Sequence, residues 1–132
     1  MKPNWKFKSL NEIEHTNYGN PDEAPTFLVK RCLQLAKIPV GDFSVEDLRI
    51  MIGQEFGLKY LIPLAIEKLE ENLFAEGDYY PGDLLSNVLK APLSFWKQHM
   101  DLWQEVDHLI SGRKSRIISE KISLTLFESV KR

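Results

Sequence analysis

The sequence predicts an all-α protein that folds as a single compact domain of five to six helices. Its 132 residues fall within the usual size of one domain. Apolar residues recur three and four positions apart through most of the chain, which is the spacing of a helix face. Proline and glycine interrupt these stretches at intervals typical of helix lengths. The composition, 43% hydrophobic and 27% charged, is ordinary for a globular protein and selects no function.

Residues 1–24 are expected to form an N-terminal arm that packs on a helical body made of residues 25–132. The arm carries scattered aromatic residues, which favour packing over free movement. Ser9 and Glu12 have the spacing of a capping box, in which each side chain bonds the backbone of the other residue. This spacing predicts a short helix near residues 10–15.

The first long helix is predicted for about residues 26–37, because Pro39 follows it as a breaker. The single cysteine, Cys32, lies within it and is expected to be a core residue rather than a reactive thiol. One thiol forms neither an internal disulfide nor a cysteine-rich zinc site, which suits a reducing compartment such as the cytosol. The helix is expected to bury one broad apolar face made of Phe27, Leu28, Cys32, Leu35 and Ala36.

Three further helices are predicted in the middle of the chain. Ser44 begins the first of them, with Asp47 in its first turn to accept a backbone hydrogen bond. The second starts near Pro63, since the first turn of a helix tolerates the missing N–H of proline. The third is short and spans residues 84–90. The inner faces of the first two are predicted to be Val45, Leu48, Ile52, Phe56 and Ile62, Ile66, Leu69, Leu73.

The C-terminal third is predicted to contain one long helix and one ambiguous segment. Ser94 caps the long helix, which runs to about Ile110 and is ended by Gly112. Residues 114–130 carry apolar side chains every four positions, as in a helix. Around residues 122–126 apolar and polar side chains alternate, as in a strand. The length of the segment favours a helix and leaves the strand as the alternative.

Motif searches point away from catalysis. The sequence has no Gly-rich phosphate loop, no Gly-x-Ser-x-Gly elbow and no His-Glu-x-x-His pair, so we expect no enzyme activity, cofactor or metal. Asp101, Glu105 and His108 recur along one helix face, where they could hold a divalent metal or an acid–base pair. The plainer interpretation is a solvated face. A small metal-dependent hydrolase that uses these three residues, or a generic helical adaptor, is the alternative function.

The charge distribution is more informative than the net charge of −2, which argues against a general nucleic-acid binder. Residues 42–83 contain ten acidic and three basic residues, whereas residues 112–132 contain two acidic and six basic ones. The acids and bases could neutralise each other within the fold. Alternatively, the acidic middle forms a face complementary to a basic partner, which would speed encounter with it. No apolar run approaches the roughly 20 residues of a membrane helix, so no membrane contact is expected.

The stretch of residues 76–83 is the most unusual part of the chain. It places carboxylates beside two tyrosines in a turn shaped by glycine and proline, and tyrosine is enriched at protein interfaces. The alternative is that one tyrosine is buried and the acids only cap the helix at Leu84. The candidate residues for contact with a basic partner are Glu70, Glu71, Glu76, Asp78, Tyr79 and Asp83.

Four motifs then suggest a family. The chain contains, in order, SVEDLRIMIGQ (44–54), GLKYLIPLAIE (57–67), AEGDYYPGDLL (75–85) and FW (95–96). Together they resemble the small immunity proteins of bacterial contact-dependent growth inhibition systems, over roughly residues 26–96. The resemblance implies a non-enzymatic cytoplasmic antitoxin that binds the C-terminal toxin domain delivered by a neighbouring cell.

The toxins of such systems are often nucleases, so the resemblance implies a basic, nuclease-like partner and no direct contact with nucleic acid. A nuclease that grips phosphate must present a basic surface, and an acidic inhibitor can occupy that surface. The resemblance therefore fits the acidic middle of the chain. It does not assign the contact residues, because the recognisable motifs also contain residues such as Leu48, Ile52, Leu64 and Leu69 that are expected to maintain the fold.

Overall fold

The computed structural model describes residues 4–131 and confirms the all-α fold class. Nine α-helices and no β-strand lie within that range, and five of the helices have seven residues or more. Short 3-10 turns occupy Asn4–Phe7, Pro21–Glu23, Val40–Asp42 and Ser129–Lys131. The α-helices are α1 Leu10–Ile13, α2 Phe27–Leu35, α3 Val45–Gly53, α4 Leu58–Glu71, α5 Asp83–Leu89, α6 Leu93–Gln98, α7 Met100–Ile110, α8 Lys114–Ser119 and α9 Thr125–Glu128.

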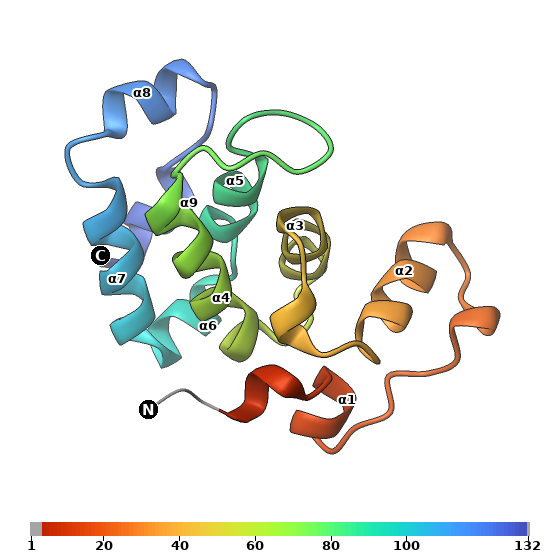
Figure 1. Ribbon diagram of the computed structural model, residues 1–132. Helices are drawn as coiled ribbons and strands as arrows, with labels where there is room; N and C mark the ends of the chain where they lie inside the picture. Colours follow the sequence, from red (N-terminus) through yellow and green to blue (C-terminus); the bar gives the residue numbers. More distant parts are fainter. Residues whose placement is uncertain (1–3, 132) are drawn as a thin grey trace.

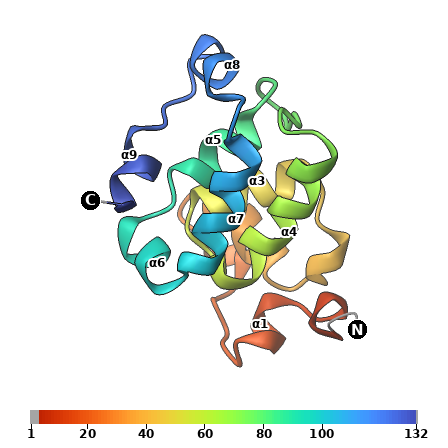
Figure 2. The same ribbon diagram turned by 90° about the vertical axis from the view of Figure 1, so that its left-hand side faces the viewer.

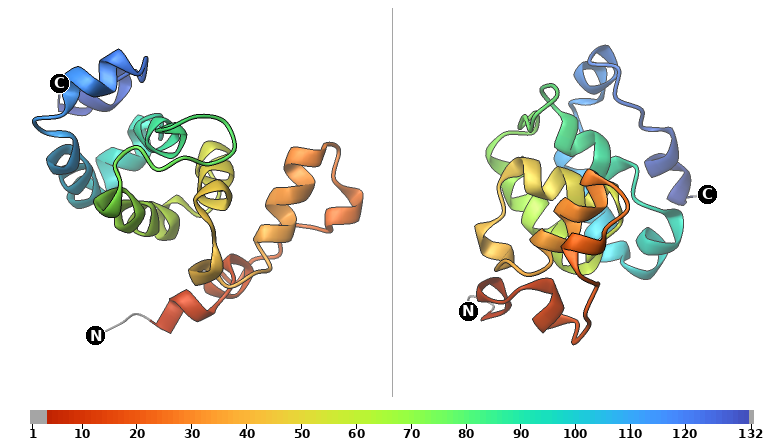
Figure 3. Two further views of the ribbon diagram at one scale, coloured as in Figure 1. Left: turned by 45° about the horizontal axis from the view of Figure 1, so that its top comes forward. Right: turned by 90° about the vertical axis from the view of Figure 1, so that its right-hand side faces the viewer.

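The body of the molecule is built around α4, which contacts α3, α5 and α7 (Figure 1). α3 also packs against α5, so these four helices enclose one apolar core. The N-terminal segment runs along one end of the body, and α8 lies at the opposite end (Figure 2). α2 packs against α3 and leads away from the body on one side (Figure 3). Four residues expected to maintain the fold are all buried, namely Leu48, Ile52, Leu64 and Leu69.

Local capping chemistry sets the helix starts that the sequence predicts. The Ser44 hydroxyl accepts the amide of Asp47 at 3.1 Å, and the Asp47 carboxylate accepts the amide of Ser44 at 3.0 Å. Ser9 and Glu12 form the same reciprocal pair at the start of α1. Each pair satisfies two backbone donors that would otherwise lack partners in the first turn, which confirms these two predicted capping positions. The third predicted cap, Ser94, is wrong, because Ser94 lies inside α6, whose N-cap is Pro92.

The N-terminal residues contact the body at several points. The ring of Trp5 lies 5.8 Å from that of Tyr60, and the Lys6 ammonium pairs with Glu67 at 2.9 Å. Leu10 is fully buried and approaches Gly57 so closely that a Cβ there would lie 2.7 Å from its side chain. The segment is therefore held by aromatic, ionic and apolar contacts with the body.

Two predicted features of α2 and α4 are wrong. Phe27 and Leu28 do not join the buried face of α2: Phe27 is 92% exposed, because the start of α2 extends beyond the body (Figure 3). Cys32 is buried as expected, and this burial raises the pKa of its thiol. α4 begins at Leu58 rather than near Pro63, which lies in the helix interior. Burial of apolar side chains along α4 outweighs the backbone hydrogen bond that proline lacks.

The C-terminal third is more broken than predicted. The expected long helix is two helices, because His99 adopts φ −135° and ψ 55° between α6 and α7. Residues 114–130 form neither one helix nor a strand but α8 and α9, with Lys121 at φ 63° between them. The spacing of the buried residues matches neither a single helix nor a strand; they are Ile117, Ile122, Leu124, Phe127 and Val130. Tertiary packing determines these breaks.

Candidate functional site

The predicted contact residues fall into two groups. Glu76, Asp78, Tyr79 and Asp83 belong to the connection between α4 and α5, while Glu70 and Glu71 lie at the end of α4. We call residues 76–81 the tyrosine loop. It is closed by a β-bridge between its first and last residues, Glu76 and Pro81. It projects at the end of the molecule where α8 lies (Figure 1).

Asp83 holds the tyrosine loop from beneath. Its side chain is only 2% exposed, so the prediction that it belongs to the contact surface is not supported by the structure. Its carboxylate accepts hydrogen bonds from the amides of Gly77 at 2.7 Å and Tyr79 at 3.1 Å. The alternative, in which the acids only cap the next helix, is also wrong: the N-cap of α5 is Gly82, which makes no side-chain cap hydrogen bond, and Asp83 bonds amides of the preceding loop instead.

Two residues of α3 that sequence reasoning missed complete this anchor. The Glu46 carboxylate accepts hydrogen bonds from Nε and Nη2 of Arg49, at 2.6 and 2.5 Å, and from the amide of Asp78, at 2.8 Å. The hydrogen bonds from Arg49 hold the pKa of Glu46 below its usual value, and the Asp78 amide adds to this effect. The Arg49 guanidinium lies 3.8 Å from the Asp83 carboxylate. Two carboxylates and one guanidinium therefore fix the loop to α3 and α5.

The two tyrosines of the loop point outward. Tyr79 is 71% exposed and Tyr80 is 42% exposed, so the alternative in which one of them is a core residue is wrong. The Arg49 guanidinium lies 4.4 Å from the centre of the Tyr79 ring, in cation–π geometry. Gly77 permits the close approach of the loop to α3, because a Cβ at that position would clash with Glu46 Oε1.

The exposed carboxylates of the loop belong to Glu76 and Asp78. Within residues 4–131, neither of them takes part in an ion pair. The inward-facing carboxylates of Glu46 and Asp83 share one arginine. The surface of the loop is therefore acidic and aromatic, while its base is a hydrogen-bonded charge network.

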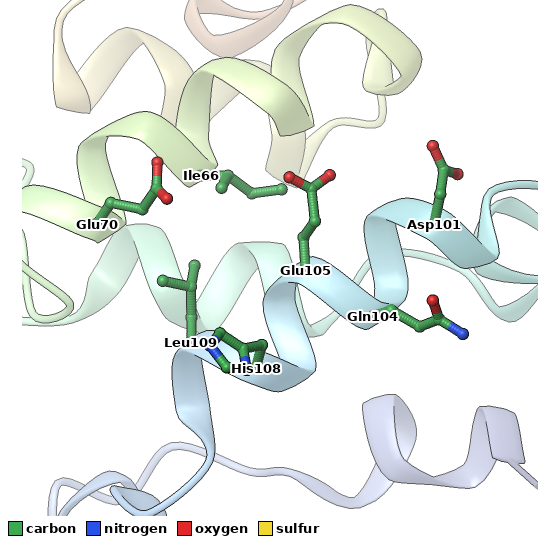
Figure 4. A pocket seen from close by; sticks show the side chains of 7 residues that line it. All are labelled: Ile66, Glu70, Asp101, Gln104, Glu105, His108 and Leu109. Atoms are coloured by element: carbon green, nitrogen blue, oxygen red, sulfur yellow. The ribbon is translucent and has the colours of Figure 1, made fainter.

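The end of α4 borders two grooves. One, of about 440 Å³, lies between α4 and α7, with Glu70 on the α4 wall and Glu105 on the α7 wall (Figure 4). Ile66 lies between these two carboxylates in Figure 4. The other groove, of about 530 Å³, brings Glu70 and Glu71 opposite the arginines Arg113 and Arg116. Glu70 thus shares one groove with other acids and the other groove with arginines.

Comparison with known protein families identifies the family of this chain. A family model for CDI immunity proteins, where CDI is contact-dependent growth inhibition, matches residues 12–106. This range runs from the last two residues of α1 into α7, and it includes the tyrosine loop and the end of α4. The chain belongs to the CDI immunity protein family. No curated protein and no solved structure showed significant similarity to it.

As a member of the CDI immunity proteins, the chain belongs to a non-enzymatic family whose members bind a cognate CDI toxin. Asp101, Glu105 and His108, the basis of the alternative hydrolase, all lie exposed on α7 beside the first groove. No group of three or more metal-ligating side chains with suitable geometry occurs in the part of the chain that the structure describes. The alternative function therefore has no support from the family or from the geometry of these residues.

None of the helices that the structure describes is long and apolar enough to cross a membrane.

This CDI immunity protein also contains residues anchoring the loop that a local sequence signal could have indicated. Glu46 and Arg49 are three positions apart on a helix, a spacing typical of an intrahelical ion pair. Nothing in that spacing indicates that the pair supports Asp78, which lies 32 residues further along the chain. Tyr80 is not among the predicted contact residues, and its exposure adds it to the candidate surface.

Proposed function

We propose that this chain is a cytoplasmic immunity protein that neutralises its cognate CDI toxin by tight, stoichiometric binding, and that the toxin domain is basic and nuclease-like. The observation that carries the proposal is the surface of the tyrosine loop. Glu76 and Asp78 present exposed carboxylates beside an exposed Tyr79, on a backbone that α3 and α5 hold in place. Such a surface suits a partner that uses positive charge to bind phosphate.

The remaining acids of the surface extend this proposal to the end of α4. Glu70 and Glu71 are exposed there, and Glu70 shares a groove with Asp101 and Glu105. Carboxylates spread over a face raise the rate of encounter with a basic partner more than they raise affinity. We therefore assign Glu70, Glu71, Glu76 and Asp78 to steering of the toxin. Asp83 is left out, because it is buried beneath the loop.

The experiment compares two double charge reversals. Glu76→Lys with Asp78→Lys changes the loop, and Asp22→Lys with Glu23→Lys makes the same charge change at exposed residues before α2. The probe is a catalytically inactive form of the C-terminal toxin domain encoded directly upstream of this gene. The loop variant is expected to slow association by about tenfold at low salt and to reduce its salt dependence. Equal association rates for the two variants would remove the loop from the contact surface.

Neutralisation itself is measured by growth. Cells that express the active toxin domain are expected to grow only when this chain is co-expressed. Failure of the wild-type chain to bind that domain or to protect these cells would contradict the proposed function.

A further inference from the structure

We propose that Tyr79 is a pre-formed anchor that inserts into an apolar pocket of the toxin domain, and that Arg49 is the residue that positions it. This inference rests on the proposed function and assigns separate roles within the same surface. The carboxylates of Glu76 and Asp78 govern how fast the toxin arrives, whereas the Tyr79 ring governs how long it stays bound.

The backbone of the loop is fixed before any partner arrives. Three successive amides, those of Gly77, Asp78 and Tyr79, each donate a hydrogen bond to a carboxylate of α3 or α5. Asp83 receives two of these bonds and Glu46 receives the third. A loop held in this way loses little conformational entropy on binding, so more of the contact energy appears as affinity.

Formation of this anchoring network requires a charged side chain to be buried, which opposes folding. Burial of the Asp83 carboxylate carries a desolvation penalty, which its loop amides and Arg49 must offset. The side chain that the network displays, Tyr79, remains largely in solvent and adds no burial to the core. The arrangement is explained if its purpose is to hold that ring in one place. Tyrosine provides large contact area with only two rotatable side-chain bonds, which suits a binding anchor.

The chemistry of the partner site follows from the position of Arg49. Its guanidinium already occupies one face of the Tyr79 ring, 4.4 Å from the ring centre. A cation on that face draws the π electrons toward it and leaves the outer face less attractive to a second cation. Aliphatic or aromatic carbon is therefore the better partner for the outer face. The exposed carboxylates of Glu76 and Asp78 precede the ring closely in sequence, so the pocket is apolar and its rim is basic.

The experiment measures dissociation of the inactive upstream-encoded toxin domain from variants of the full chain. Tyr79→Ala is expected to raise the dissociation rate about 30-fold, which is the size of an interface hot spot, and to change association less than threefold. Tyr79→Phe is expected to stay within about threefold of the wild type, since the ring supplies the contact. Both variants alter an exposed side chain, so the fold should be retained.

Arg49→Lys tests the positioning role, because lysine keeps the charge and loses the two-pronged contact with Glu46. We expect it to raise the dissociation rate at least about fivefold alone and to add nothing further in the Tyr79→Ala background. Arg31→Lys, at the exposed ion pair with Asp47, is the matched control and should leave the rate unchanged. Circular dichroism of each variant checks the fold.

Three outcomes would overturn the inference. If the wild type binds and Tyr79→Ala leaves the dissociation rate within threefold, Tyr79 is no anchor, while the proposed function stands. If Arg49→Lys weakens binding equally with and without the Tyr79 ring, Arg49 does not act through that ring. If the wild type does not bind the toxin domain, both the inference and the proposed function fail.

Discussion

The tyrosine loop and the C-terminal segment, residues 114–131, are both irregular stretches, and α8 at the start of that segment lies at the same end of the molecule as the loop (Figures 1 and 2). The C-terminal segment contacts the chain just before the loop, where the Arg116 guanidinium lies 4.4 Å from the centre of the Phe74 ring. The loop leaves its aromatic rings exposed, and the carboxylates that anchor it, those of Glu46 and Asp83, face inward. The C-terminal segment does the opposite, since it buries Phe127 and leaves most of its charged side chains exposed.

This difference predicts separate roles for the two regions: stability for the C-terminal segment and recognition for the loop. The C-terminal segment lies outside the range matched by the family model, yet Phe127 completes the core. Its ring centre lies 5.4 Å from that of Trp96 and 5.0 Å from that of Trp103, and its carbonyl accepts the Trp103 indole N–H at 2.9 Å. The loop contributes little apolar burial and offers its rings to solvent. Variants in the segment should therefore change folding, and variants in the loop should change binding.

The largest effect is expected for Phe127→Ala. Loss of a fully buried aromatic ring between two tryptophans leaves a cavity, so the free energy of unfolding should fall by about 3–5 kcal/mol. Urea denaturation followed by tryptophan fluorescence measures this loss. Leu126→Ala, at the partly exposed neighbour, is the control and should cost less than about 1 kcal/mol. Equal losses for both variants would mean that Phe127 does not hold the segment. Toxin dissociation from the folded variant should be unchanged.

An intermediate effect is expected for Asp83→Asn, because Asp83 is buried, as Phe127 is, but its carboxylate holds the tyrosine loop. The amides of Gly77 and Tyr79 would lose a charged acceptor, so unfolding should become easier by about 1–3 kcal/mol. Hydrogen exchange at those two amides should accelerate more than in the core. Asp101→Asn, at an exposed carboxylate of α7, is the matched control and should change stability by less than about 0.5 kcal/mol. Unchanged exchange at both amides would contradict the anchoring role of Asp83.

Local chemistry made much of the fold predictable from the sequence. The capping residues Ser9 and Ser44 start helices because they act on a backbone only three residues away. The break at His99 was not predictable, since it depends on how Trp96 and Trp103 both reach Phe127. The same tertiary demand spaces the buried residues of the C-terminal segment in a pattern with no regular period.

The candidate site was predictable in place but not in orientation. The unusual composition of residues 76–83 marks the segment, and the structure shows it as a projecting loop. Whether Asp83 points inward and Tyr79 outward depends on partners that α3 supplies more than 30 residues earlier in the chain. Composition identifies such a loop, while its anchor is visible only in three dimensions.

The smallest effect is the response of the loop to acid, and it tests whether Glu46 acts as an anchor. Its pKa in the folded chain lies below the unfolded value of 4.5, because Arg49 and the Asp78 amide favour the charged form. The stability that Glu46 contributes is therefore complete above pH 4.5 and is lost as the pH falls through the folded pKa. After correction for intrinsic rates, exchange of the Asp78 amide should accelerate between about pH 5 and pH 3.

Glu46→Gln should remove this pH dependence, because its amide side chain has no carboxylate to protonate. The amide of Val29 provides the internal control, since it donates to the Thr26 hydroxyl, which does not titrate in this range. If Val29 accelerates as much as Asp78, acid is loosening the whole chain rather than the loop. If Glu46→Gln keeps the full pH dependence at Asp78, another group titrates there. A response confined to Asp78 and removed by the variant would show that charge holds the loop independently of the apolar contacts that hold the C-terminal segment.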